Sequence, residues 1–187
     1  MLSRLAPSAG KLLISEPFLM DPNFKRSVVF VTEHQEEGTV GFILNHKSTL
    51  LLSDLVPDFT GGDFPVYLGG PVAVDTIHFI HRCSSLLTDG EEIAKGIYWG
   101  GNFEALKVLV NSHHIKPEDI KFFIGYSGWS AEQLAEEMKE NTWIVSDQFD
   151  ADLVFSNNEE ELWKEVIINL GPKYAHVSNF PQNPNLN

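Results

Sequence analysis

Residues 125–130 read Gly-Tyr-Ser-Gly-Trp-Ser, and Ser127 is the side chain in this segment that could do chemistry. A serine between glycines at a strand-to-helix turn resembles the Gly-x-Ser-x-Gly elbow, which exposes a nucleophilic hydroxyl. Here the second glycine, Gly128, comes one residue early, so the match is incomplete. A hydrolase also needs a base beside the serine, and no spacing in the chain supplies one. We therefore predict no catalytic residue, and keep a hydrolase that uses Ser127 as the second alternative.

Three side chains that can bind metal ions, His78, His81 and Cys83, stand close together. Side chains alternate between the two faces of a strand, so only His81 and Cys83 would share a face. A zinc site needs three or four ligands. The aspartates within residues 147–152 are typical of a solvated loop in an acidic chain. The sequence therefore predicts neither a metal site nor a cofactor.

Two glycine pairs stand next to expected strands or helices. Gly69-Gly70-Pro71 follows an apolar run, and Gly100-Gly101 precedes a helical pattern. Either pair could offer backbone N–H groups to an anion. Neither carries the lysine of a P-loop or the spacing of a dinucleotide-binding loop. Tight turns explain both pairs.

The segment that contains Ser127 also holds several devices for starting a helix. The apolar strand 121–124 is predicted to end in a glycine turn, after which a helix begins. Ser130 and Gln133 have the spacing of a capping box, and Trp129 and Leu134 have that of a hydrophobic staple. We expect a rigid unit of strand, turn and helix.

Hydrophobic periodicity predicts the remaining elements. Strands are expected at 27–33, 39–45, 64–68, 76–81, 97–99 and around Trp143, and helices at 103–112, 131–140 and 159–170. The short polar loop 34–38 predicts a hairpin between the first two strands. Strands cluster early and helices late, which favours an α+β fold. We expect one compact domain with a mixed or largely antiparallel sheet, open or barrel-like, and about three flanking helices.

Composition limits the class of protein. A chain of 187 residues with 43% hydrophobic residues predicts one domain, 1–187, with frayed tails at 1–9 and 178–187. No apolar run is long enough for a membrane span. Cys83 is the only cysteine, and a secretory signal is not recognised, so we expect a cytoplasmic protein. The net charge of −13 argues against direct binding to nucleic acid.

Several blocks occur in order along the chain: Gly10-Lys-Leu-Leu13, Asp21-Pro-Asn-Phe24, Ser27-Val-Val-Phe30, Gly41-Phe-Ile-Leu-Asn45, Gly69-Gly-Pro-Val72 and Gly125-Tyr-Ser-Gly-Trp129. Together they resemble the AlgH/YqgE family of bacterial proteins over roughly residues 10 to 175. The resemblance implies a compact single-domain α+β fold. The family is named for a transcriptional regulator of alginate synthesis, but no chemistry is established for it as a class.

The same resemblance suggests that the glycine turns line one groove. The candidates for ligand or partner binding are Asn45, Gly69, Gly70, Pro71, Gly125, Tyr126, Gly128, Trp129 and Gln133. We expect a non-catalytic binding or regulatory protein that acts through an unidentified protein or small-molecule partner. The first alternative is a transcriptional regulator that touches DNA directly, although the sequence shows no helix-turn-helix pattern and no basic stripe.

Overall fold

In the computed structural model, which describes residues 5–180, the strands form one continuous sheet of ten. They are β1 (Leu12–Ser15), β2 (Val28–His34), β3 (Gly38–Ile43), β4 (Lys47–Leu51), β5 (Pro65–Leu68), β6 (Val72–His81), β7 (Glu91–Ala94), β8 (Ile97–Trp99), β9 (Ile120–Ser130) and β10 (Trp143–Ser146). Their order is β10-β1-β2-β3-β9-β6-β8-β7, with β4 paired to β5 and β5 to β9. All neighbours are antiparallel except β5 and β9. Within residues 5–180, β10 pairs only with β1 and β7 only with β8, so the sheet is open and the barrel-like alternative is wrong.

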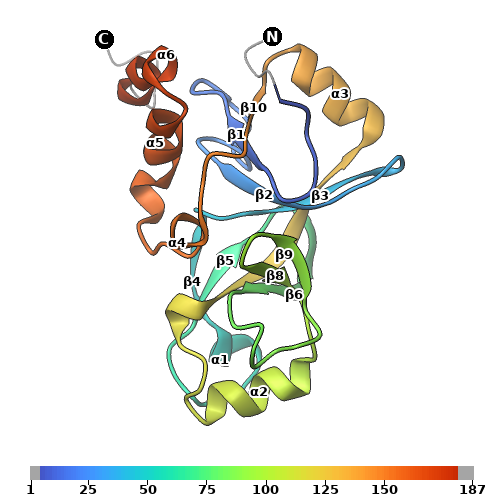
Figure 1. Cartoon of the computed structure of the whole chain (residues 1–187), viewed down its shortest axis with the longest axis vertical. Coiled ribbons are helices and arrows are strands. Elements are labelled where there is room, and N and C mark those ends of the chain that lie inside the picture. Colours follow the sequence, from blue (N-terminus) through green and yellow to red (C-terminus); the bar gives the residue numbers. More distant parts are fainter. Residues whose placement is uncertain (1–4, 181–187) are drawn as a thin grey trace.

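Helices pack against three different parts of this sheet. They are α1 (Leu52–Leu55), α2 (Phe103–Asn111), α3 (Ala131–Lys139), α4 (Ala151–Val154), α5 (Glu159–Asn169) and α6 (Pro172–Ala175), with the 3-10 turns η1 (Pro117–Asp119) and η2 (His176–Asn179). The three long helices, α2, α3 and α5, are the three that the periodicity predicts. In Figure 1, α3 and α2 lie at opposite ends of the molecule, and α5 runs beside β1 and β2. The predicted single-domain α+β fold is confirmed.

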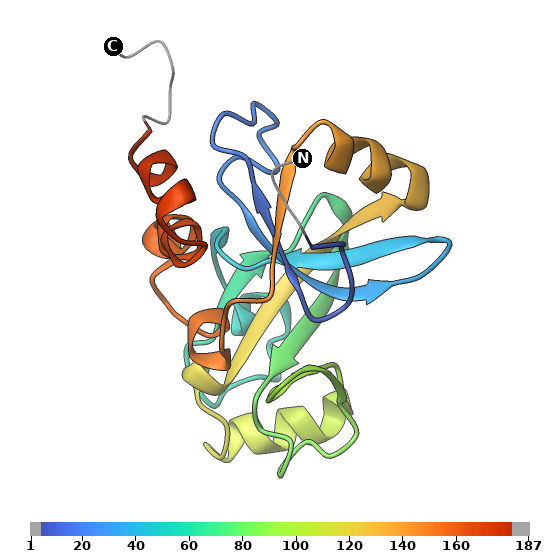
Figure 2. The same cartoon turned by 45° about the horizontal axis from the view of Figure 1, so that its top comes forward.

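Strand β9 joins two halves of the sheet (Figure 2). Its first half lies between β5 and β6, with Phe122 opposite both Val66 and Phe79. Its second half pairs with β3, where Gly41 lies opposite Ser127. One strand of 11 residues therefore belongs to both halves.

The prediction that residues 125–130 form a turn is wrong, because β9 continues through them to Ser130. Gly125 has a φ of +66°, which bends the strand without ending it. The backbone of Gly69 and Gly70 crosses the strand at this bend. A Cβ on Gly69 would lie 2.4 Å from the carbonyl oxygen of Gly125, and one on Gly70 would lie 2.2 Å from that of Tyr126. The glycines therefore permit a close crossing of two backbones.

Helix α3 begins directly after β9, as the capping signals predict. The Ser130 hydroxyl accepts a hydrogen bond from the Gln133 backbone N–H at 3.1 Å. The Gln133 side chain donates to Glu137 at 3.0 Å, so the second bond of the predicted capping box is replaced. Trp129 and Leu134 are buried in the same cluster, consistent with the predicted staple.

Three apolar clusters fill the layers between the helices and the sheet. One lies between α5 and β1–β2, a second under α1 and α2, and a third under α3. At the C-terminal end, Ser178 is buried and Phe180 stacks on Phe18 at 5.3 Å. Of the tails that the sequence predicts to be frayed, residues 5–9 form no helix or strand. Residues 1–4 and 181–187 lie outside the described residues. In the described part of the chain, no helix has the length and apolarity to cross a membrane.

The crossing of the two backbones yields a first prediction. Gly125→Ala should lower the free energy of unfolding by about 3 kcal/mol or more, because its Cβ would lie 2.6 Å from the carbonyl oxygen of Gly70. Gly96 is the matched control, since its φ of +74° is similar but nothing lies within 4 Å of its Cβ position. Gly96→Ala should cost only the ~1 kcal/mol of backbone strain. Urea unfolding of both variants tests this, and equal costs would contradict the steric explanation.

Candidate functional site

The structure does not bring all nine predicted binding candidates together. Gly69, Gly70 and Gly125 lie at the backbone crossing and pack against one another. The carbonyl oxygen of Gly69 accepts hydrogen bonds from the Ile43 N–H and the Ser127 hydroxyl, both at 2.9 Å. These glycines are therefore parts of the framework, while Pro71 lies exposed beside them.

Tyr126, Gly128 and Trp129 line a shallow hollow of about 290 Å³ along the β2–β3 hairpin. Trp129 is only 4% exposed, and its indole N–H donates to Glu137 at 2.8 Å. Gln133 is exposed on α3 and is not part of this hollow. The remaining candidate, Asn45, lies at a different and larger pocket.

Ser127 is not placed to act as a nucleophile. Its side chain is fully buried, and its hydroxyl donates to the carbonyl oxygen of Gly69. The elbow resemblance requires an exposed serine on a sharp turn, whereas this serine lies within a strand.

The two histidines of β6 lie in different surroundings, as strand alternation predicts. His78 contacts the Thr76 hydroxyl at 2.9 Å and its ring lies beside Phe42. His81 is buried, with one ring nitrogen 3.0 Å from the carbonyl oxygen of Gly100 and the other 3.5 Å from the Cys83 sulfur. Among residues 5–180 no group of three or more His, Cys, Asp or Glu side chains is arranged to hold a metal ion.

A polar pocket of about 450 Å³ lies between the start of α5 and the segments that flank β2 and β3. We call it the α5 pocket, and its residues are Lys25, Arg26, Asn45, His46, Glu159, Glu160, Glu161, Trp163 and Lys164. Cationic and anionic side chains from residues 25–26 and 159–164 meet there, together with Asn45 and His46, around an open volume. A concave volume on which several polar groups converge is a candidate site for a small ligand.

Arg26 forms one wall of the α5 pocket. Its φ is +49°, in the left-handed region that a residue with a Cβ rarely adopts. The Asn45 amide holds this conformation, since it donates to the Arg26 carbonyl oxygen at 2.8 Å and accepts from the Val28 N–H at 2.9 Å. The Arg26 guanidinium lies over the Trp163 ring, with Cζ 4.7 Å from the ring centroid. Asn45 therefore supports the pocket through the backbone.

Ser27 and His46 form a serine–histidine pair next to this pocket. The Ser27 hydroxyl lies 3.2 Å from His46 Nε2. Burial lowers the pKa of His46, opposed by a hydrogen bond to the backbone of Lys25, so the imidazole is neutral near pH 7. Ser27 itself has no exposed surface.

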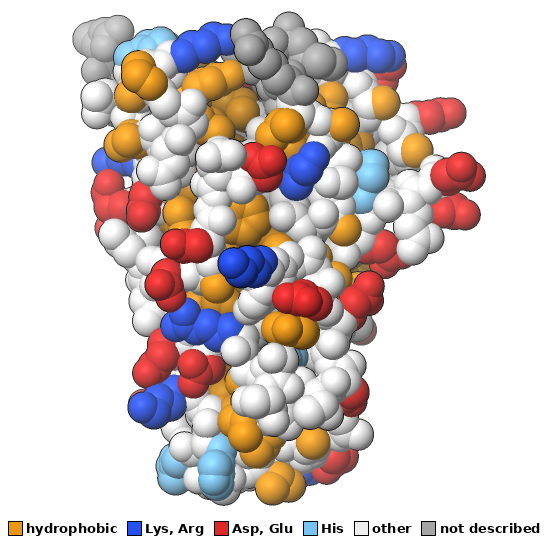
Figure 3. Space-filling view, viewed as in Figure 1, with side chains coloured by type: hydrophobic (Ala, Val, Ile, Leu, Met, Phe, Trp, Pro, Cys, Tyr) orange, Lys and Arg blue, Asp and Glu red, His pale blue; other side chains and the backbone are white. Residues whose placement is uncertain are grey.

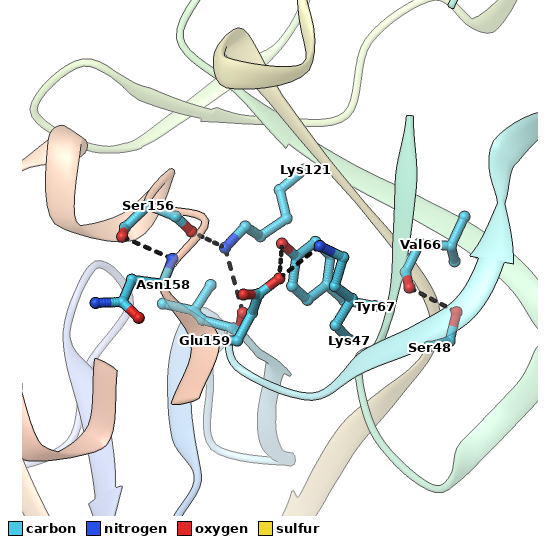
Figure 4. A network of polar contacts seen from close by, with 9 residues as sticks. Lys47, Ser48, Val66, Tyr67, Lys121, Ser156, Asn158 and Glu159 are labelled. Carbon is cyan, nitrogen blue, oxygen red and sulfur yellow. Dashed lines mark hydrogen bonds and ion pairs between the residues drawn. The ribbon is translucent and has the colours of Figure 1, made fainter. Parts of the chain in front are cut away.

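A buried lysine, Lys121, lies next to Glu159, which is one of the residues that line the α5 pocket (Figure 4). Lys121 is 2% exposed, and its ammonium group donates to the carbonyl oxygens of Leu44 and Ser156, both at 3.2 Å. It also lies 4.4 Å from the centroid of the Tyr67 ring. Lys121 thus ties β9 to the end of β3 and to the segment before α5.

Glu159 belongs both to the lining of the α5 pocket and to the surroundings of Lys121. Its carboxylate accepts hydrogen bonds from the Tyr67 hydroxyl and the Lys47 ammonium group, both at 3.0 Å. Burial raises the pKa of Tyr67, and the charge of Glu159 raises it further. Burial by itself would raise the pKa of Glu159, but its own backbone N–H, Lys47 and Tyr67 together lower it. Burial lowers the pKa of Lys121 to about 7, with the charge of Glu159 opposing the shift.

One residue in the sequence pointed to this network, although the hydrophobic periodicity did not reveal it. Lys121 is the one charged residue within the apolar stretch 120–124 of β9. A charge at a buried strand position needs partners, which here come from residues far away in the sequence. Arg26 and His46 carried no comparable local signal, because only the folded chain brings them to α5.

Comparisons with known proteins agree with this architecture. The fold resembles the crystal structure of a protein from Corynebacterium diphtheriae, with a TM-score of 0.78 and 21% identity over 95% of both chains. It also resembles the solution structure of the AlgH protein from Pseudomonas aeruginosa, with a TM-score of 0.71 and 24% identity over 96% of this chain and 98% of that one. At these identities the two structures support the fold alone.

Sequence relatives define the family. The chain is 40% identical to a UPF0301 protein of Chlorobaculum parvum over 96% of its own length and 95% of the relative's. It is 41% identical to a UPF0301 protein of Bacteroides fragilis over 99% of its own length and 94% of the relative's. The family model described as AlgH-like matches residues 12–175. The chain therefore belongs to the AlgH-like family, which confirms the resemblance seen in the sequence.

Lys121 yields a second prediction. Its pKa is lowered to about 7 by folding, from 10.5, so the unfolded chain binds more protons between these values and stability rises with pH across that range. Lys121→Met removes this dependence. The free energy of unfolding of the variant, minus that of the native chain, should be higher at pH 6 than at pH 10. The difference should be on the order of 2–4 kcal/mol, since one pKa unit equals about 1.4 kcal/mol.

Urea unfolding at both pH values measures this difference. Lys95, which is exposed and forms no ion pair with described residues, supplies the control Lys95→Met. Equal pH profiles for the native chain and Lys121→Met would show that Lys121 keeps its ordinary titration.

Proposed function

We propose that this protein is a non-catalytic small-ligand-binding protein whose site is the α5 pocket. The observation that carries the proposal is the pocket itself, where charged and neutral polar side chains from three stretches of the chain surround an open volume of about 450 Å³. Gly69, Gly70 and Gly125 support a framework role instead, because their backbone atoms pack against one another at the crossing. A regulatory role would then act through the occupant of the α5 pocket.

Binding is favoured over catalysis because the serine–histidine pair lacks the other parts of a hydrolase. The Ser27 N–H donates to the Ser15 hydroxyl at 2.8 Å, and the Val28 N–H donates to Asn45. Both are therefore unavailable to stabilise an oxyanion, which is usually the largest contribution to acyl transfer. Ser27 also has no exposed surface from which to reach a substrate.

The charge distribution argues against direct contact with DNA. On the face shown in Figure 3, basic side chains are interspersed with acidic ones rather than gathered into a stripe. The net charge of −13 opposes the neutralisation of phosphates that DNA binding requires. A cytoplasmic location is part of the same proposal and is supported by the single cysteine.

The third prediction tests the α5 pocket directly. Trp163 lies under Arg26 in this pocket, whereas Trp129 and Trp143 belong to the core under α3. In protein labelled with 5-fluorotryptophan, titration with small anionic, cationic and neutral metabolites should shift the ¹⁹F signal of Trp163 and leave those of Trp129 and Trp143 in place.

Assignment of the signals by Trp→Phe variants completes the experiment. Shifts confined to Trp129 would move the binding site to the hairpin hollow and overturn the proposal. An esterase activity that is lost in Ser27→Ala, with the fold retained, would show that the protein is an enzyme.

A further inference from the structure

We propose that the α5 pocket recognises an oxyanion, a carboxylate or phosphate group, through the edge of the Arg26 guanidinium that carries Nε. This inference rests on the proposed function and specifies the chemical class of its ligand. It is carried by the surroundings of Arg26, by the pairing of charges in the pocket and by the backbone that holds Arg26.

The Arg26 guanidinium has an unused donor. One terminal nitrogen, Nη2, donates to the carbonyl oxygen of Phe180, and the flat face of the group lies on Trp163. The Nε atom is buried and has no hydrogen-bond partner within residues 5–180. A buried donor without an acceptor costs about 1–3 kcal/mol. An oxyanion would satisfy it, because the fork of N–H groups on arginine matches the two oxygens of a carboxylate or phosphate.

The acidic side chains of the pocket are mostly engaged with other partners. Glu159 is bound by Lys47 and Tyr67, and both oxygens of Glu161 lie 3.2 Å from the Lys164 ammonium group. Among the lining residues this leaves two cations, Lys25 and Arg26, without an ion pair, against one acid, Glu160. The pocket therefore favours an anion locally, although the chain as a whole is acidic.

The backbone places Arg26 in this position at a cost. A φ of +49° in a residue other than glycine is strained, and such strain persists where the surrounding structure enforces it. Here the Asn45 amide enforces it through the Arg26 carbonyl oxygen. The Arg26 side chain that this backbone carries lies on Trp163 and lines the pocket, so the contact is in place before a ligand binds.

The test uses the ¹⁹F signal of Trp163 in the full chain, with sodium phosphate, sodium acetate, glucose and methylammonium chloride as probes at matched ionic strength. Phosphate or acetate should shift the signal in a saturable manner, whereas glucose and methylammonium should not. The ratio of the phosphate and acetate affinities identifies which oxyanion the pocket prefers.

Variants then assign the contact. Arg26→Lys keeps the charge but removes Nε–H and the fork, and should weaken anion binding about tenfold. Lys25→Gln should weaken it about threefold, and Lys173→Gln on α6, outside the pocket, should leave it unchanged. Circular dichroism and thermal melts establish that each variant is folded. If Arg26→Lys is unfolded, the threefold loss of acetate affinity expected in Lys25→Gln replaces it as the deciding measurement.

The outcomes separate this inference from the function on which it rests. A Trp163 response to glucose or methylammonium but not to the anions would refute the oxyanion and leave the α5 pocket as a binding site. Unchanged anion affinity in folded Arg26→Lys, or in Lys25→Gln where that variant decides, would also refute it. No Trp163 response to any probe or metabolite would overturn both.

Discussion

The close crossing of Gly69–Gly70 over β9 is the constraint on which the rest of the structure depends. It allows one strand to serve both halves of the sheet, since any side chain at the crossing would separate the two backbones. From the crossing, Gly69 accepts the N–H of Ile43, and the neighbouring Leu68 N–H donates to the carbonyl oxygen of His46 at 2.7 Å. The corner that follows β3 is thereby fixed, and that corner forms part of the α5 pocket. The glycine motif acts on the site from a distance, by holding the strand end that builds it.

Lys121 is a second constraint on the structure, because its hydrogen bonds join separate segments of the chain. A buried ammonium group loses its hydration, and its two carbonyl acceptors and the Tyr67 ring compensate for only part of this loss. This loss of hydration is the main cause of the lowered pKa of Lys121. We interpret the role of this lysine as positional rather than stabilising. It aligns β9, the end of β3 and the start of α5, which are the elements that form the pocket and its rear wall.

The sequence predicts the helices and strands better than it predicts how they are arranged in space. The three long helices and the β2–β3 hairpin carry strong periodic or turn signals, and the cap at Ser130 is formed by the expected side chain. Three strands are not predicted: β4 and β7 have no alternating apolar pattern, and β1 has only four residues. The segment 125–130 was interpreted as a turn because two glycines usually end a strand. Local pattern cannot show that a distant backbone needs the space that those glycines leave.

The candidate site shows the same limit. Asn45 was selected with the family blocks, but Arg26, His46 and Glu159 were not, because their proximity is a product of the fold. Arg26 is recognisable only from its φ and from its Nε, which has no partner in the described part of the chain, and both are properties of the folded chain. The most informative residues of the site are therefore those whose local sequence context is ordinary.

The pairing of β1 with β10 has a consequence for the way this chain is made. Leu12 lies opposite Ser146, and the Trp163 indole N–H donates to the carbonyl oxygen of Ser15 at 3.0 Å. On the ribosome, the meander β1–β2–β3 can form early, but the outer edge of β1 has no neighbour until more than a hundred further residues have been translated. An open apolar edge of this kind is a template for aggregation. Synthesis of the chain therefore leaves this edge open to pairing with another chain until β10 emerges.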